Sequence, residues 1–184
     1  MTIPRDEAAD TLRQIEQAGQ RSAAAYHDAM AAPHLVLWGV IWMIGYAAVY
    51  FRPAWWAVWP ALIVIGFVGS FGLGRRMKGG AMPAGFGRRY TLTILAVTAF
   101  ITALFAILPP PSGAQVGAFI PLLVALWYGL SGIWTGAPRI AWLGLAVGAV
   151  TVGAYFWQPA AFALWMAAAG GGGLMLGGLW MRRV

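Results

Sequence analysis

The chain has 184 residues, of which 61% are hydrophobic and 9% are charged, with a formal net charge of +7 and a mean hydropathy of +0.73. A water-soluble domain carries about a quarter charged residues, so this composition excludes a soluble globular protein and is typical of an integral membrane protein. The sequence is rich in Trp and Gly and contains no Cys, which excludes disulfides, thiolate metal sites and cysteine nucleophiles.

Residues 1–33 are the most polar part of the chain and are predicted to form a cytosolic amphipathic helix. The segment holds all five acidic residues and three arginines. No proline interrupts it between Arg5 and Ala31, and less polar residues recur every three or four positions, which is the helical period. These residues are Ala8, Leu12, Ile15, Gly19, Ala23, Tyr26 and Met30. The helix is expected to end at Pro33, where the first membrane span begins.

Six charge-free stretches follow, each about as long as the roughly 20 apolar residues that cross a bilayer core as a helix. They run approximately over residues 35–51, 54–74, 90–108, 115–135, 140–157 and 160–181. Residues 34–184 are therefore predicted to be a six-helix transmembrane bundle made of three hairpins. The predicted fold class is an all-α integral membrane protein with six transmembrane helices, preceded by the cytosolic amphipathic helix.

The positions of the basic residues predict how these spans are oriented. Lys and Arg accumulate in short cytoplasmic loops. With the N-terminus in the cytosol, Arg52 is the only one of the 12 basic residues that falls on the outer side. We therefore expect a multi-pass protein of the cytoplasmic (inner) membrane, with both termini cytosolic.

Two surfaces are candidates to receive the amphipathic helix. One belongs to a cytosolic protein partner, which would bind the helix in a groove. The other is the chain's own basic loop, residues 75–89, whose charge of +5 complements the acidic helix. The residues assigned to partner binding are Leu12, Ile15, Tyr26, Arg75, Arg76, Lys78, Arg88 and Arg89. The alternative is that the helix lies along the inner membrane interface without a partner.

Small residues at spacing four predict close helix packing, because lipid offers no hydrophobic drive for helix association. The predicted packing residues are Gly66, Ser70, Gly144, Gly148, Gly173 and Gly177. Some of these faces are also candidates to join protomers, so a homo-oligomer remains open.

Aromatic residues form a second pattern in the first span. Trp38, Trp42 and Tyr46 stand at spacing four, so their rings share one side of the helix. This stripe is a candidate wall of a pocket for a planar or cationic ligand. Trp127, Tyr128 and Trp134 of the fourth span are the candidate second wall. The alternative is that these rings pack on neighbouring helices or face lipid.

No Asp, Glu, Lys or His lies well within a predicted span, and neither paired carboxylates nor a Ser-His-Asp arrangement is found. We therefore expect that the chain has no enzymatic activity and binds neither a metal nor a cofactor. A haem held by His27 or His34 is a weaker alternative. The favoured function is a regulatory, sensory or scaffolding role, in which the N-terminal helix and loop 75–89 contact a cytosolic protein. The alternative is a passive transporter or channel for a neutral or aromatic small molecule, with an aromatic-lined path. The expected partners are the lipid bilayer, the cytosolic protein and a second copy of the chain. No nucleic acid is expected to bind.

Overall fold

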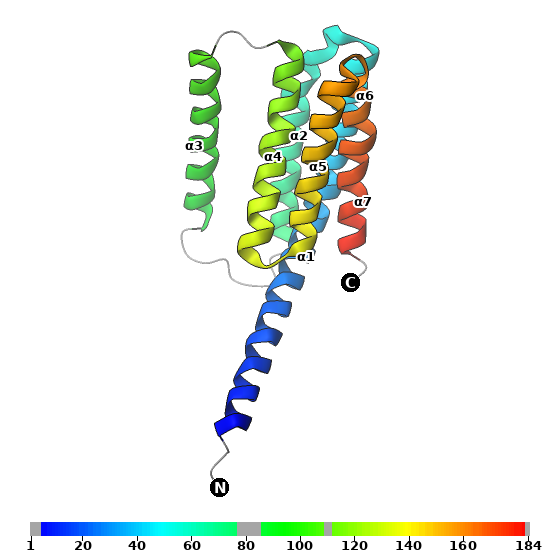
Figure 1. Cartoon of the computed structure of the whole chain (residues 1–184). Coiled ribbons are helices and arrows are strands. Elements are labelled where there is room, and N and C mark those ends of the chain that lie inside the picture. Colours follow the sequence, from blue (N-terminus) through cyan, green and yellow to red (C-terminus); the bar gives the residue numbers. More distant parts are fainter. Residues whose placement is uncertain (1–4, 77–85, 109–111, 183–184) are drawn as a thin grey trace.

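The computed structural model describes residues 5–76, 86–108 and 112–182, which form helices and short links without any strand (Figure 1). Five long helices come first: α1 (Arg5–Phe51), α2 (Val58–Arg76), α3 (Phe86–Ile107), α4 (Gly113–Thr135) and α5 (Pro138–Trp157). A last helical stretch combines α6 (Phe162–Trp165), the π-helical segment η3 (Met166–Gly171) and α7 (Gly172–Met181). The short 3-10 helices η1 (Pro53–Ala57) and η2 (Pro159–Ala161) follow α1 and α5.

Five segments of the described chain are long and apolar enough to cross a membrane. They are Asp28–Phe51, Pro53–Arg75, Gly113–Thr135, Pro138–Trp157 and Pro159–Met181. The described apolar part of α3, Leu95–Ile107, is shorter than a membrane span requires. The structure thus confirms the all-helical, multi-pass membrane class, with five spans supported by length and composition.

The expectation that the N-terminal helix ends at Pro33 is wrong, because α1 is one helix of 47 residues that contains this proline. Proline lacks an N–H and removes the bond to the carbonyl of Ala29, but membrane helices tolerate this loss where neighbouring groups support the turn. The next residue, His34, adds a side-chain contact in the same turn, since its Nδ1 lies 3.0 Å from the carbonyl oxygen of Met30. The N-terminal helix and the first span are therefore a single element.

The first half of α1 projects beyond the other helices (Figure 1). We call residues 5–27 the stalk, and the end of the bundle from which they project the stalk end. Every described side chain from Asp10 to Tyr26 is exposed, and Asp28 is the first buried one. The stalk is thus carried away from the bundle by helix continuity rather than by packing.

Within the bundle, α1 packs against α7 and η3 on one side and against α2 on another. The helix α5 packs between η3 and α4 and contacts both. The contact between α1 and the last stretch depends on glycine. A Cβ added at Gly39 would lie 2.7 Å from the carbonyl oxygen of Gly171, and one added at Gly178 would lie 2.6 Å from that of Ala32. The backbones approach so closely that no side chain fits between them.

The helix α3 stands at the edge of the molecule, beside α4 (Figure 1). Phe105 meets Phe119 of α4 edge to face, with ring centroids 5.2 Å apart. Most of the described side chains of α3 are exposed. In a membrane, such an apolar helix faces lipid over most of its surface.

Candidate functional site

The stalk joins the bundle at a buried ion pair. Asp28 is only 6% exposed, and its Oδ2 accepts a hydrogen bond from Nη1 of Arg139 at 3.0 Å. The guanidinium of Arg139 also lies over the ring of Trp180, with its Cζ 5.1 Å from the ring centroid. We call Asp28, Arg139 and Trp180 the clasp, because they connect α1 to the start of α5 and the end of α7.

The electrostatics of the clasp make its two charges depend on one another. Arg139 is the second residue of α5, where the positive end of the helix dipole disfavours a cation. A carboxylate of opposite charge offsets that cost. Asp28 in turn is buried, and its Oδ1 has no hydrogen-bond partner within the described part of the chain. An isolated buried charge is costly, so Arg139 is what makes an ionised Asp28 acceptable there.

Sequence reasoning assigned Asp28 to the polar helix and Arg139 to a cytosolic loop, and so missed the clasp. The signal that could have revealed the clasp is a helical period of core positions that continues across Pro33. One series of buried positions in α1 recurs at alternating steps of four and three residues. It consists of Asp28, Ala32, Leu35, Gly39, Trp42 and Tyr46, and Ile41 and Gly45 are buried beside it. Read through the proline, the core face of the first span predicts that Asp28 is buried.

The stalk presents the apolar residues proposed for partner binding to solvent. Leu12 and Ile15 are 61% and 62% exposed, and Tyr26 is 64% exposed. Asp10 pairs with Arg13 of the same helix at 3.3 Å. An exposed pair of this kind contributes little to stability. These three apolar side chains of the stalk are therefore accessible.

Most of the predicted basic loop cannot be placed. Lys78 lies outside the described residues, and the side chains of Arg76, Arg88 and Arg89 are not described either. Arg75 is exposed, and its guanidinium lies over the ring of Phe71, with its Cζ 5.4 Å from the centroid. Docking of the stalk on this loop stays a prediction.

The two predicted aromatic walls do not face one another. Trp42 and Tyr46 are buried in the core, where Tyr46 donates a hydrogen bond to the carbonyl oxygen of Gly117 at 2.8 Å. Trp38 donates from Nε1 to Oγ of Ser70 at 3.1 Å. On α4, by contrast, Trp127 and Trp134 are 60% and 86% exposed.

Only Tyr128 of the predicted second wall is directed inward, and its Cβ lies close to Gly144 of α5. The expectation of an aromatic pocket is therefore corrected, because the first set of rings is used in packing and most of the second faces outward.

Replacing Tyr46 by phenylalanine is expected to lower the free energy of unfolding by about 1 kcal/mol, because it removes one hydrogen bond between membrane helices and leaves a carbonyl unpaired. The ring itself and its contacts are retained. Detergent titration of the purified variant measures the change. Stability equal to that of the parent would show that this bond between α1 and α4 contributes nothing.

The predicted small residues have different surroundings. Gly66 and Ser70 of α2 face Trp38 of α1. A Cβ added at Gly144 would lie 2.6 Å from backbone atoms of α4. Gly148 and Gly177 make looser contacts with Ala125 and Leu143.

Gly173, in contrast, has open space where a Cβ would lie, so its predicted packing role is corrected. The positions that sequence reasoning missed are Gly39, Gly171 and Gly178, at the contact between α1 and the last helical stretch.

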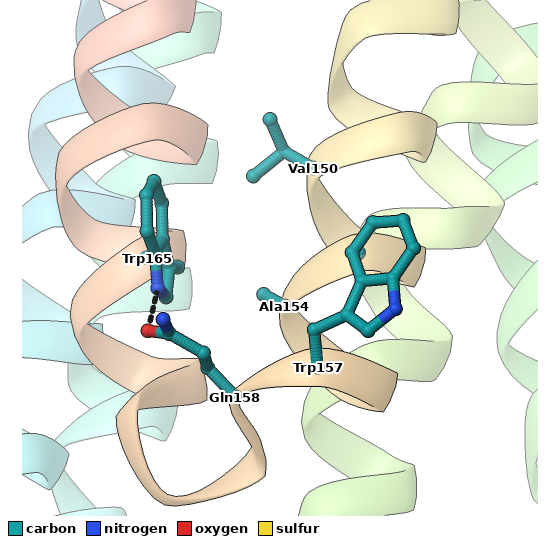
Figure 2. A pocket seen from close by; sticks show the side chains of 6 residues that line it. Val150, Ala154, Trp157, Gln158 and Trp165 are labelled. Carbon is teal, nitrogen blue, oxygen red and sulfur yellow. Dashed lines mark hydrogen bonds between the residues drawn. The ribbon is translucent and has the colours of Figure 1, made fainter.

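The end of the bundle opposite the stalk carries a shallow groove between α5 and α6 (Figure 2). Its volume is about 230 Å³, and its lining is almost entirely apolar. The lining residues are Val150, Gly153, Ala154, Trp157, Gln158 and Trp165. One hydrogen bond crosses its end, from Nε1 of Trp165 to Oε1 of Gln158 at 2.7 Å. A second apolar groove, of about 260 Å³, lies between α4 and α5.

Comparisons with protein-family models, curated proteins and solved structures give no match to this chain.

Proposed function

We propose that this chain is a regulatory or scaffolding protein of the cytoplasmic (inner) membrane, without enzymatic activity. Its bundle anchors a helical stalk, which presents Leu12 and Ile15 to a cytosolic protein. The observation that carries the proposal is the unbroken helix α1, which enters the bundle at Asp28 and projects as an exposed helix before it. A helix of 23 residues, 5–27, reaches about 35 Å at 1.5 Å per residue, beyond the membrane interface.

The charge distribution supports a cytosolic stalk. The described basic residues Arg75, Arg139 and Arg182 belong to helix termini at the stalk end, whereas Arg52 follows the opposite end of α1. Short cytoplasmic loops retain basic residues, so the stalk end is the cytosolic end in this proposal. Both chain termini then lie in the cytosol if α3 is a sixth span. The whole helix has 22 residues, or about 33 Å, which is the length of a span, although its described apolar part, Leu95–Ile107, is shorter.

The partner chemistry follows from the stalk surface. An amphipathic helix is recognised by a hydrophobic groove that receives residues at spacing three and four. Leu12 and Ile15 have that spacing and are exposed, whereas Gln17 lies on the opposite side of the helix. A partner that binds in this way distinguishes one face of the stalk from the other.

We expect a photo-crosslinking amino acid at Leu12 or Ile15 of the full chain in native membranes to capture one and the same cytosolic protein. The same amino acid at Gln17 is the matched control and should capture that protein at least tenfold less. Immunoblotting and mass spectrometry measure the products. Equal capture from both faces, or crosslinks to lipid alone, would contradict the proposal in favour of a stalk that lies on the membrane.

A further inference from the structure

The groove between α5 and α6 combines an apolar lining with one polar side chain, Gln158. Figure 2 shows Val150 and Ala154 directed from α5 toward Trp165 of α6, while Trp157 flanks the groove on its other side. The indole of Trp157 lies against Gly153, since a Cβ added there would be 3.3 Å from its Cε3 and 3.2 Å from its Cζ3. The groove therefore has an apolar floor, and two indoles border it.

The polar end of the groove offers hydrogen-bond donors. Trp165 can only donate, so the group of Gln158 that it meets at 2.7 Å must be the amide oxygen. The amide nitrogen of Gln158 is left with its two N–H groups at the end of the groove (Figure 2). The complementary ligand group is a hydrogen-bond acceptor.

Position and size define the rest of the ligand. The floor lies within the apolar segment Pro138–Trp157, and Gln158 lies at its end, the depth at which hydrocarbon gives way to polar headgroups. A volume of about 230 Å³ is smaller than the sites of roughly 300–1,000 Å³ that hold drug-sized molecules. It accommodates a segment of a longer molecule, and an acyl chain joined to an ester carbonyl satisfies both the floor and the donors.

We propose that this groove is a site for a glycerophospholipid, with one acyl chain along Val150 and Ala154 and its ester carbonyl accepting a hydrogen bond from the amide of Gln158. Apolar burial does not favour the groove over bulk lipid, because both are apolar. Specific retention must therefore come from the hydrogen bond at Gln158 and from contact with the indoles. An ester lipid should then be retained better than an ether lipid of the same length.

Native mass spectrometry of the full chain, delipidated and reloaded with a diacyl or a dialkyl phosphatidylcholine, tests the proposal. The parent should retain one diacyl molecule per chain, with at least a fivefold preference over the dialkyl analogue. Gln158→Leu, at an exposed position, should remove the preference. Ala154→Leu fills the floor and should lower retention about tenfold, whereas Ala149→Leu adds the same atoms at an exposed position of α5 outside the groove and should not.

Three results would overturn the proposal. Equal retention of ester and ether lipids by the parent chain would remove the role of Gln158, and this comparison needs no variant. Undiminished retention by a folded Ala154→Leu protein would place the lipid elsewhere. A dimer that is lost in Ala154→Leu, without any change in lipid mass, would make a second copy of the chain the occupant. None of these results depends on the proposed stalk partner.

Discussion

Gly178→Ala is expected to lower the free energy of unfolding by about 1–3 kcal/mol, the usual cost of overpacking a close contact. A Cβ at this position would lie 2.6 Å from the carbonyl oxygen of Ala32 and 2.9 Å from Cγ2 of Val36. A backbone oxygen cannot rotate away as a side chain does. The added methyl group therefore forces α1 and α7 apart, and dispersion contacts along the whole interface weaken.

Gly173→Ala is the matched control, because it adds the same atoms to the same helix. Nothing lies within 4 Å of a Cβ at Gly173. Replacing a helical glycine by alanine also removes a conformational entropy cost of about 0.5–1 kcal/mol, so this variant should be as stable as the parent or more so. Titration with denaturing detergent, followed by circular dichroism, measures both. Equal destabilisation by the two substitutions would contradict the α1–α7 contact.

This pair of glycines illustrates how far sequence patterns extend. Spacing four predicts that some face of a helix carries small residues, but α7 contains glycines on several faces, and composition does not say which one meets a neighbour. Gly173 and Gly177 satisfy the pattern as well as any others. The choice of Gly171 and Gly178 depends on where α1 lies, which is a property of the tertiary arrangement.

Four predicted spans match described segments within two residues at each end, because hydropathy and length are local properties that a bilayer strongly constrains. The first predicted span, 35–51, begins seven residues after the start of its segment, Asp28–Phe51. The candidate site was less predictable. A proline usually ends a helix in water, and that rule placed a boundary at Pro33. The boundary concealed the period that connects Asp28 to Ala32 and Leu35 and buries the aspartate.

The prediction that the aromatic stripe lines a ligand pocket was wrong for a related reason. Spacing four correctly predicts that Trp38, Trp42 and Tyr46 share a side of α1, but it contains no information about what that side meets. In the structure it meets Ser70, Trp59, Gly117 and Phe162, all of which come from other helices. Partners distant in the chain are not contained in the periodicity of one segment.

Arg139→Met is expected to destabilise the bundle by about 3 kcal/mol, because it leaves the buried carboxylate of Asp28 without its counter-charge. Asp28 is 6% exposed and its Oδ1 already lacks a partner in the described chain, whereas the side chain of Arg139 is 30% exposed. Partial hydration of the arginine places the cost at the lower end of the range for buried pairs. Detergent titration again gives the measurement.

The double variant Asp28→Leu/Arg139→Met distinguishes two contributions to the free energy of unfolding. One is the net contribution of the ion pair, and the other is the cost of leaving one buried charge without its partner. Replacing both charges by apolar groups of similar size is often nearly neutral. We therefore expect the double variant to be more stable than Arg139→Met alone, with a coupling free energy of about 1–3 kcal/mol between the two sites. Additive effects would show that Asp28 and Arg139 do not interact.

We also expect the clasp to determine how firmly the stalk is held. Pro33 removes one helix hydrogen bond just after Asp28, so the turn between stalk and bundle lacks one of its bonds. The ion pair of the clasp holds α1 against α5 on the stalk side of this turn. The sequence has no Cys, so spin labels can be placed at Gln17→Cys and Leu145→Cys alone. Arg139→Met should broaden the distance distribution between these labels.

Adding Pro33→Ala to Arg139→Met restores the missing helix bond and should narrow the distribution again. A width that depends on neither substitution would mean that the stalk takes its direction from the helix alone and that the clasp acts only in stability. A distribution narrowed by Pro33→Ala would instead show that proline and clasp are balanced against one another at the base of the stalk. As long as Pro33 is present, the orientation in which Leu12 and Ile15 meet a partner then depends on the ion pair between Asp28 and Arg139.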